Sequence, residues 1–235
     1  MMKLELSPRL HAVAEWIPDG ARLADIGTDH AYLPVSLLLD GRLSSAIAAD
    51  VRPGPLEHAK RTAGEYGVTE QLCFRLCDGL SGIANEDCDT ITIAGMGGET
   101  IAHILSAAPW AKHEHTLILQ PQSTQHVLRG FLAENGYEIC AERIVREGER
   151  WYPVLLAHGG SMPPLTPGEQ WCGRTQDWVN QPERLDYLNW LLRRTQAQLT
   201  GMEQARRIDA AKQDELRAVS LFLQGEIERL QQKMC

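Results

Sequence analysis

The 235-residue sequence has no long hydrophobic run, and it has fewer basic residues (23 Lys and Arg) than acidic ones (31 Asp and Glu). No stretch approaches the ~18 consecutive apolar residues of a membrane span, and the start, MMKLELSPRL, lacks the apolar core of a signal peptide. We therefore expect a cytoplasmic protein without a membrane partner. Aromatic residues make up only 6%, yet 43% hydrophobic and 23% charged residues are typical of a globular fold.

Several catalytic signatures are also missing. The chain has no G-x-G-x-x-G loop for a pyrophosphate, no G-K-[ST] phosphate loop and no G-x-S-x-G elbow. Its six cysteines are scattered without paired C-x-x-C motifs, which predicts reduced, structural thiols. The one close histidine pair, His113 and His115, has no further ligands nearby, so we predict no metal site.

The net charge of −8 is unevenly distributed along the chain. Residues 1–160 carry 13 Lys and Arg against 21 Asp and Glu, whereas residues 161–235 carry 10 of each. Two basic pairs in the second segment, Arg193-Arg194 and Arg206-Arg207, can present positive charge to a polyanion. Taken alone, these pairs are more typical of a solvated helix face.

Hydrophobic periodicity predicts alternating strands and helices, which indicates a parallel α/β sheet. Ser7-Pro8 starts a short first helix. The expected strands are 22–26, 45–51, 72–77, 89–94 and 116–120, with helices at 32–40, 55–66, 98–106 and 123–135. Two further strands, 137–146 and 151–158, are joined by a hairpin turn at 147–150. This layout is that of a Rossmann-like class I methyltransferase sheet with an antiparallel hairpin at its end.

A loop rich in glycine and proline follows at 159–168, and two amphipathic helices follow it. Their apolar residues recur every three or four positions, which predicts an antiparallel coiled-coil hairpin that turns near residues 208–213. We therefore expect two domains: a cofactor-binding catalytic domain at 1–160, and a linker with a C-terminal coiled coil at 161–235. The sequence leaves the oligomeric state undetermined, and we favour a monomer.

The strongest functional signal is the segment Ala24-Asp-Ile-Gly-Thr-Asp-His30, followed by Asp50 at the end of the second strand. An acidic residue at this strand end accepts hydrogen bonds from ribose hydroxyls. The loop after Gly27 carries Asp29, which would repel a pyrophosphate but suits the sulfonium and ammonium groups of S-adenosylmethionine. The residues therefore indicate S-adenosylmethionine as cofactor.

Two more strand ends carry candidate residues at the same sheet edge. Asp78-Gly79 follows the third strand, where Asp78 is expected to accept the adenine N6 protons, and Ala94-Gly95-Met96-Gly97-Gly98 follows the fourth. Each segment alone is equally typical of a cap or tight turn. Their recurrence at successive strand ends favours a shared site.

Taken together, several strings resemble the bacterial tRNA methyltransferases that modify N1 of adenine 22. These strings are Leu6–Leu10, Ala24–Pro34 (ADIGTDHAYLP), Asp78-Gly79, Ile91–Gly98 (ITIAGMGG) and Leu117–Pro121 (LILQP). The resemblance covers essentially the whole chain, with the tail its less distinctive part. It implies a Rossmann-like catalytic domain, a C-terminal coiled coil, S-adenosylmethionine as donor and tRNA as acceptor.

The resemblance also assigns roles. Asp25, Gly27, His30, Asp50, Asp78, Gly79, Ala94 and Gly95 are expected at the cofactor, and Gly97, Gly98, Gln120 and Pro121 in the wall of the acceptor pocket. Asp29 is our candidate to stabilise charge on the adenine ring, and Arg9 to hold a phosphate or the flipped nucleotide at the mouth of the site.

Two other functions remain open from the sequence. A class I methyltransferase acting on a small molecule would use the coiled coil to dimerise. A non-catalytic binding protein would use a vestigial cofactor fold to position the helical hairpin for a partner.

Overall fold

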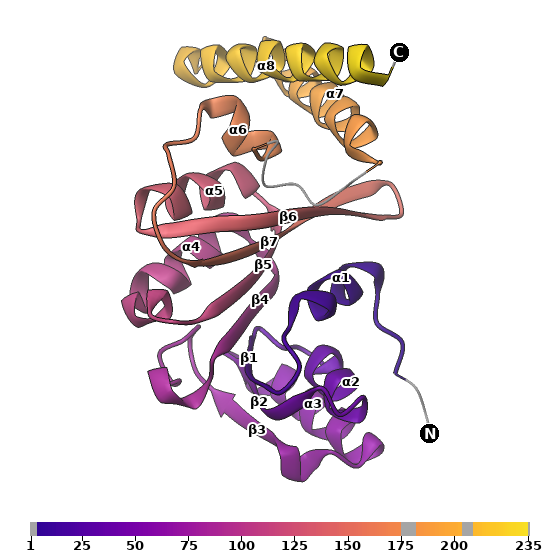
Figure 1. Cartoon of the computed structure of the whole chain (residues 1–235), viewed down its shortest axis with the longest axis vertical. Coiled ribbons are helices and arrows are strands. Elements are labelled where there is room, and N and C mark those ends of the chain that lie inside the picture. Colours follow the sequence, from indigo (N-terminus) through magenta and orange to yellow (C-terminus); the bar gives the residue numbers. More distant parts are fainter. Residues whose placement is uncertain (1–3, 175–181, 204–208, 235) are drawn as a thin grey trace.

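A seven-stranded sheet forms the body of the protein (Figure 1). The computed structural model describes residues 4–174, 182–203 and 209–234. The strand order is β3-β2-β1-β4-β5-β7-β6; the first five strands are parallel, and β7 and β6 are antiparallel. The strands are β1 (Ala21–Ile26), β2 (Leu43–Asp50), β3 (Leu72–Leu76), β4 (Thr90–Gly97), β5 (Thr116–Ser123), β6 (Tyr137–Glu147) and β7 (Arg150–Gly159).

Helices cover both faces of the sheet because its parallel strands are apolar on both sides. On β1, Leu23 packs with the apolar cluster under α1 (Pro8–Trp16), α2 (Tyr32–Leu39) and α3 (Pro53–Tyr66). Its neighbour Ala24 packs on the opposite face with α4 (Gly98–Ala107) and α5 (Gln125–Glu134). As the sequence predicts, Ser7 caps α1 and a proline follows at its first position.

The order in which successive strands are placed in the sheet changes direction between β1 and β4. Strands β2 and β3 lie on one side of β1, whereas β4 and β5 lie on the other. The loops that leave the carboxyl ends of β1 and β4 therefore diverge, and a crevice opens between them. In open α/β sheets, ligands bind at this switch point.

The predicted alternation of strands and helices and the terminal hairpin are confirmed. Three details differ. Strand β4 continues through Gly97, with register shifts against β5, where we expected a glycine-rich turn after residue 94. A short helix, α6 (Pro167–Cys172), begins within the expected loop and continues into the linker, where we predicted no helix. Residues 210–213, expected in the tail's turn, already belong to α8.

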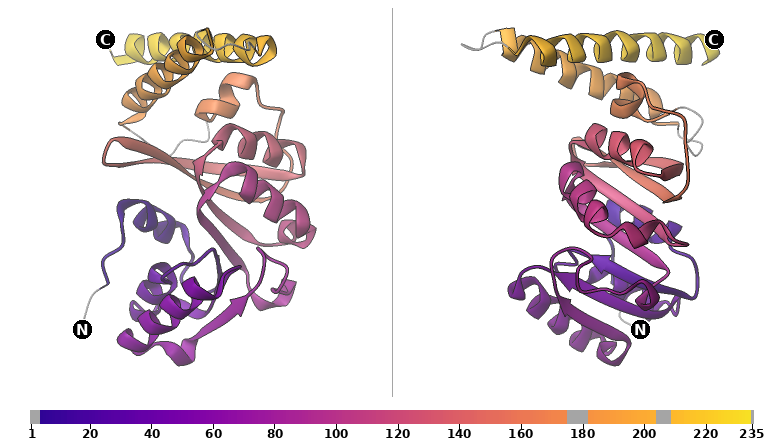
Figure 2. Two further views of the ribbon diagram at one scale, coloured as in Figure 1. Left: turned by 180° about the vertical axis from the view of Figure 1, so that it is seen from behind. Right: turned by 90° about the vertical axis from the view of Figure 1, so that its left-hand side faces the viewer.

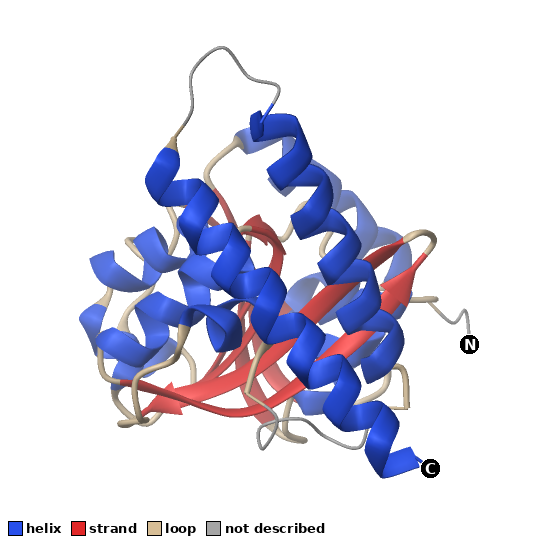
Figure 3. Cartoon of the chain, turned by 90° about the horizontal axis from the view of Figure 1, so that it is seen from above, coloured by secondary structure: helices blue, strands red, loops and turns tan. Residues whose placement is uncertain are grey.

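The C-terminal helices lie across the sheet's β6–β7 end (Figures 1 and 2). Helices α7 (Arg184–Glu203) and α8 (Ala210–Met234) pack against each other and extend over the β6–β7 hairpin, as seen from above in Figure 3. Their apolar residues, including Tyr187 and Leu188, form a third core cluster with Ile144 of β6 and Trp151 of β7. The helical hairpin is therefore anchored on the sheet. The second basic pair, Arg206-Arg207, lies outside the described residues.

No helix among the described ranges combines the length and the apolar character needed to span a bilayer.

A buried ion pair joins the sheet to α6. The guanidinium of Arg129 on α5 is fully buried and donates to Glu142 of β6 at 2.7 and 3.0 Å. The same guanidinium donates to the backbone carbonyls of Gln170 and Trp171 at 2.9 and 3.0 Å. Burial alone lowers the pKa of Arg129, but the charge of Glu142 raises it on balance. The pair thus stays ionised and fixes three elements together.

We expect Glu142→Gln to lower the free energy of unfolding by about 3 kcal/mol, because it leaves the Arg129 charge buried without its counter-ion. Urea unfolding measures this loss. The control is Lys60→Gln, which breaks an exposed ion pair with Glu57 and should cost at most about 0.5 kcal/mol. Equal effects of the two substitutions would show that the buried pair has no special structural role.

Candidate functional site

A cleft of about 260 Å³ lies at the switch point between β1 and β4. Eight residues singled out from the sequence line it: Arg9, Asp25, Gly27, Asp29, His30, Ala94, Gly95 and Gln120. They come from α1, from β1 and the loop after it, and from the carboxyl-terminal halves of β4 and β5. The topology therefore brings together segments more than 100 residues apart in sequence.

The loop after β1 adopts an unusual backbone conformation. Gly27, Asp29 and Ala31 have φ angles of 72°, 48° and 55°. The left-handed region costs a residue other than glycine on the order of 1–3 kcal/mol, and such residues cluster at functional sites. The backbone N–H groups of Gly27 and Thr28 both donate to Ala49 on β2, at 2.8 and 3.1 Å. Neighbouring secondary structure thus holds the strained loop in place.

Asp25 on β1 holds this loop through hydrogen bonds. Its two carboxylate oxygens accept hydrogen bonds from the hydroxyls of Thr28 and Thr92, each at 2.7 Å. Burial raises the pKa of the Asp25 carboxyl, although the two hydroxyl hydrogen bonds oppose the shift. With both oxygens engaged, Asp25 ties the loop to β4. Neither threonine partner was identified from the sequence.

Asp29 points its carboxylate outward. Its side chain is 65% exposed, and one oxygen lies 3.8 Å from His30 Nε2. The His30 ring stacks on Tyr32 at 5.1 Å and on His58 at 4.7 Å. Asp29, His30 and His58 thus place three metal-ligand side chains within 4.8 Å of one another, a grouping that the sequence did not predict. In this arrangement the rings of His30 and His58 are stacked on each other.

Arg9 reaches the cleft from the other side. Its guanidinium pairs with Glu147 at the end of β6 and lies over the Tyr152 ring, 4.9 Å from the centroid. It also donates to Oε1 of Gln120 at 3.2 Å. The expected position of Arg9 at the mouth of the site is thus compatible with its contacts. Glu147 lies 138 residues away in sequence, and only the fold reveals it as the partner.

The amide of Gln120 has a fixed orientation. Its side chain is 1% exposed, and Oε1 accepts from both Arg9 and the backbone N–H of Gly95, the latter at 3.1 Å. Two donors on one atom identify it as the oxygen, so Nε2 is the donor end. Within the described part of the chain, this buried Nε2 has no hydrogen-bond partner. A buried donor without a partner at a cleft is a feature that a ligand would satisfy.

The other predicted residues lie outside the lining of this cleft. Asp50 ends β2 with 7% exposure, and Asp78-Gly79 follows β3, so both lie further along the same sheet edge. Gly97, Gly98 and Pro121 are within or beside the β4–β5 pair. A Cβ on Gly98 would lie 2.3 Å from the backbone oxygen of Thr124, so packing alone requires glycine there. Their cofactor and substrate roles stay predictions.

Comparison with known proteins gives this geometry a context. Residues 6–155 match the methyltransferase domain family. The chain is 44% identical over 161 residues to the tRNA (adenine(22)-N(1))-methyltransferase of Bacillus subtilis (strain 168), which covers 68% of each chain.

Two solved structures are similar over nearly the whole chain. One is the tRNA methyltransferase TrmK of B. subtilis, with a TM-score of 0.82, 34% identity, and coverage of 96% of this chain and 100% of that one. The other is a Streptococcus pneumoniae protein in complex with S-adenosyl-L-methionine, with a TM-score of 0.78, 31% identity, and coverage of 95% and 100%.

The Asp25 network predicts a pH-dependent effect of Asp25→Asn. The folded-state pKa is raised from 3.8, so the fold penalises the charged carboxyl increasingly as pH rises through the window above 3.8. An asparagine amide keeps partners for both hydroxyls without a charge. We expect the variant to gain stability relative to the wild type as pH rises through this window, by up to about 1.4 kcal/mol for each pH unit below the folded-state pKa. Urea unfolding from pH 4 to 8 tests this; a constant difference would contradict it.

Proposed function

This chain belongs to the bacterial tRNA (adenine(22)-N(1))-methyltransferase family, and we propose that it transfers a methyl group from S-adenosylmethionine to N1 of adenine 22 in tRNA. The observation that carries the proposal is the cleft at the switch point, where an acidic loop faces a buried amide donor. As a tRNA-modifying enzyme, it would act in the cytoplasm.

The residues fit the cofactor. Asp50 uses Oδ1 to accept from the backbone N–H of Arg52 at 2.9 Å, and no hydrogen bond to its other oxygen occurs among the described residues. That oxygen can accept from ribose hydroxyls. Asp78, after the neighbouring strand β3, would accept hydrogen bonds from the adenine amino group. The loop around Gly27 would approach the methionine end of the cofactor. The carboxylate of Asp29 adds negative charge where a cationic cofactor would bind.

Bound S-adenosylmethionine supplies an electrophilic methyl group on a sulfonium. The enzyme must therefore place the neutral adenine N1 in line with that carbon and stabilise the charge that moves onto the ring. N1 is largely unprotonated at neutral pH, so no strong base is required. N1 also lies on the pairing edge, so the base must be unpaired and turned into the cleft.

We propose a division of roles between the two sides of the cleft. Gln120 Nε2 would donate to an acceptor on the base other than N1, which leaves the N1 lone pair free. Its orientation depends on Arg9 and Gly95, so Arg9 both borders the mouth and positions Gln120. Asp29 would stand close to the N6 amino group and favour the positive charge of the methylated ring.

The packing of the tail argues against its use for dimerisation. The small-molecule alternative uses the C-terminal helices to join two copies, but their apolar residues pack on Trp151 and Trp171 of their own chain. We propose that the protein is a monomer. We further propose that residues 1–160 hold the cofactor and the reacting base, whereas residues 161–235 help to position the RNA.

Methylation of unmodified tRNA tests the proposed function directly. We expect the full chain to transfer the methyl group to tRNA and to produce a reverse-transcription stop at adenine 22, because N1 methylation blocks base pairing. A tRNA with guanosine in place of that adenosine is the matched control and should not be methylated. Cofactor binding without transfer to any tRNA would overturn the proposal.

We expect Asp29→Asn to lower the single-turnover methylation rate about 10²-fold at saturating cofactor and tRNA, as for the loss of a preorganised electrostatic group. Asparagine tolerates the left-handed backbone of residue 29, so the loop should keep its shape.

The control for this variant is Asp40→Asn, which removes the exposed carboxylate at the end of α2 and should leave the rate unchanged. If Asp29→Asn instead raised the cofactor dissociation constant while the saturating rate stayed at the wild-type value, Asp29 would only shape the cofactor loop.

A further inference from the structure

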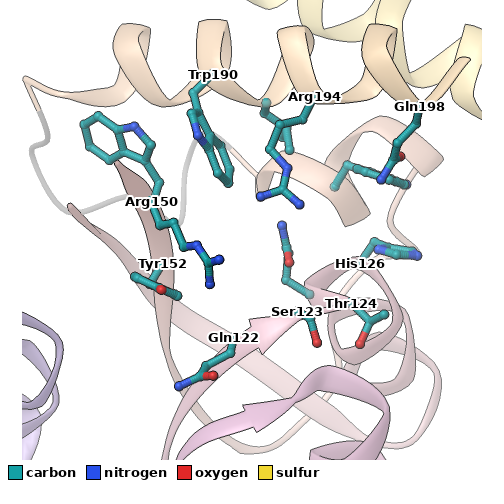
Figure 4. Close-up of a pocket in the computed structure, with 13 residues that line it drawn as sticks. Gln122, Ser123, Thr124, His126, Arg150, Tyr152, Trp190, Arg194 and Gln198 are labelled. Carbon is teal, nitrogen blue, oxygen red and sulfur yellow. The ribbon is translucent and has the colours of Figure 1, made fainter. Parts of the chain in front are cut away.

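A second cavity, of about 390 Å³, lies between the sheet and the C-terminal helices. Its floor is residues 122–126 at the end of β5 and the start of α5, together with residues 150–152 of β7. Figure 4 shows Trp190 and Arg194 descending from α7 toward Arg150, Tyr152 and Gln122. The volume lies within the range of about 300–1,000 Å³ that small-ligand pockets occupy.

The lining has the chemistry of a nucleotide site. The guanidinium of Arg194 lies over the half-buried Trp190 ring, 4.7 Å from the centroid, so the ring supports the guanidinium from one side and a base can stack on its other side. Arg150 enters from the opposite wall (Figure 4). Nucleic-acid-binding proteins stack unpaired bases on aromatic rings and guanidinium planes, and hold phosphates with arginine.

The charge of this cavity contrasts with that of the protein. The net charge is −8, yet no Asp or Glu is among the described residues that line the cavity. Both Arg150 and Arg194 are exposed, and neither makes an ion pair with a carboxylate within the described ranges. Burial lowers the pKa of His126, which stacks on Trp171, so the imidazole is neutral at pH 7. Positive charge therefore comes from the two arginines.

The cavity adjoins the proposed catalytic cleft. Gln122 lines both spaces, and the Tyr152 ring that borders the cavity carries Arg9 of the cleft on its face. A molecule that fills the cleft with one flipped base can thus extend directly into the cavity. Unpairing an adenosine frees its neighbours from part of their stacking, and an adjacent nucleotide then needs a new stacking partner.

We infer that this cavity binds one unpaired nucleotide of the RNA substrate, adjacent to the adenosine that is methylated. Its base stacks on the Arg194 guanidinium, which the Trp190 ring supports, and its phosphates contact Arg150 and the N–H edge of Arg194. The inference rests on the proposed function and assigns the α7 face a direct contact with RNA. The reacting adenosine occupies the other space, so the two sites act on successive parts of one strand.

Point substitutions test this site better than truncation. Removing α7 and α8 would expose the apolar cluster around Trp151 and Trp171 and so confound RNA binding with stability. The double variant Arg150→Gln/Arg194→Gln changes two exposed side chains and leaves that cluster intact. Its matched control is Lys60→Gln/Arg61→Gln, which removes the same charge from two exposed positions on α3, outside the cavity and outside the C-terminal helices.

We expect Arg150→Gln/Arg194→Gln to weaken tRNA binding about 10-fold or more at low salt. The slope of log affinity against log salt should also fall by about 1.5, because two phosphate contacts are lost. The control pair should change the affinity less than about 3-fold. Trp190→Leu, which keeps an apolar side chain against Tyr187 but removes the ring, should weaken binding about 10-fold with little change in salt slope.

Affinity for S-adenosylmethionine, measured by titration without RNA, should be the same in every variant. Equal tRNA affinities for the cavity pair and the control pair would overturn the inference, even while the wild type methylates tRNA. A wild type that methylates no tRNA would instead refute the proposed function, so the two failures are distinguishable. The arginine pair decides the inference if Trp190→Leu fails to fold.

Discussion

The ion pair between Arg129 and Glu142 constrains how the C-terminal part of the molecule meets the sheet. Both side chains are buried, so neither charge can be left alone without a large desolvation cost. Arg129 satisfies its remaining donors on the carbonyls of Gln170 and Trp171, which sets the position of α6. Trp171 in turn belongs to the cluster on which α7 and α8 pack. The cavity wall formed by α7 depends on this sequence of contacts.

A second constraint acts at the cleft. Left-handed backbone at Asp29 and Ala31 is unfavourable in isolation, so the surrounding structure must hold it. Ala49 of β2 binds the loop's N–H groups, and Asp25 binds the hydroxyls of Thr28 and Thr92. The loop is thus fixed from both neighbouring strands of β1. The backbone at position 29 is thus fixed before any ligand binds, which the role that we propose for the Asp29 carboxylate requires.

The sequence predicted most of the fold because the signals for it are local. Periodicity, the Ser7-Pro8 start and the 147–150 turn each act within one element, and the structure confirms them. The strand-end residues Asp25, Gly27 and Gly95 also come together at the cleft, since parallel strands present their carboxyl ends at one edge. Helix α6 was missed because it is only six residues long and its first two residues, Pro167 and Gly168, belong to the stretch that we interpreted as a loop.

The parts that sequence could not supply depend on contacts between distant residues. Glu147 meets Arg9, and Gln122 meets the walls of two cavities, only after the hairpin folds back beside α1 and β5. The same holds for Arg194: in sequence it is half of a basic pair typical of a solvated helix face, and folding places it over Trp190 opposite Arg150. An acidic protein repels RNA at long range. Two arginines in a cavity whose described lining holds no carboxylate, beside the supported guanidinium of Arg194, therefore favour recognition of an unpaired nucleotide at short range over nonspecific attraction to any duplex.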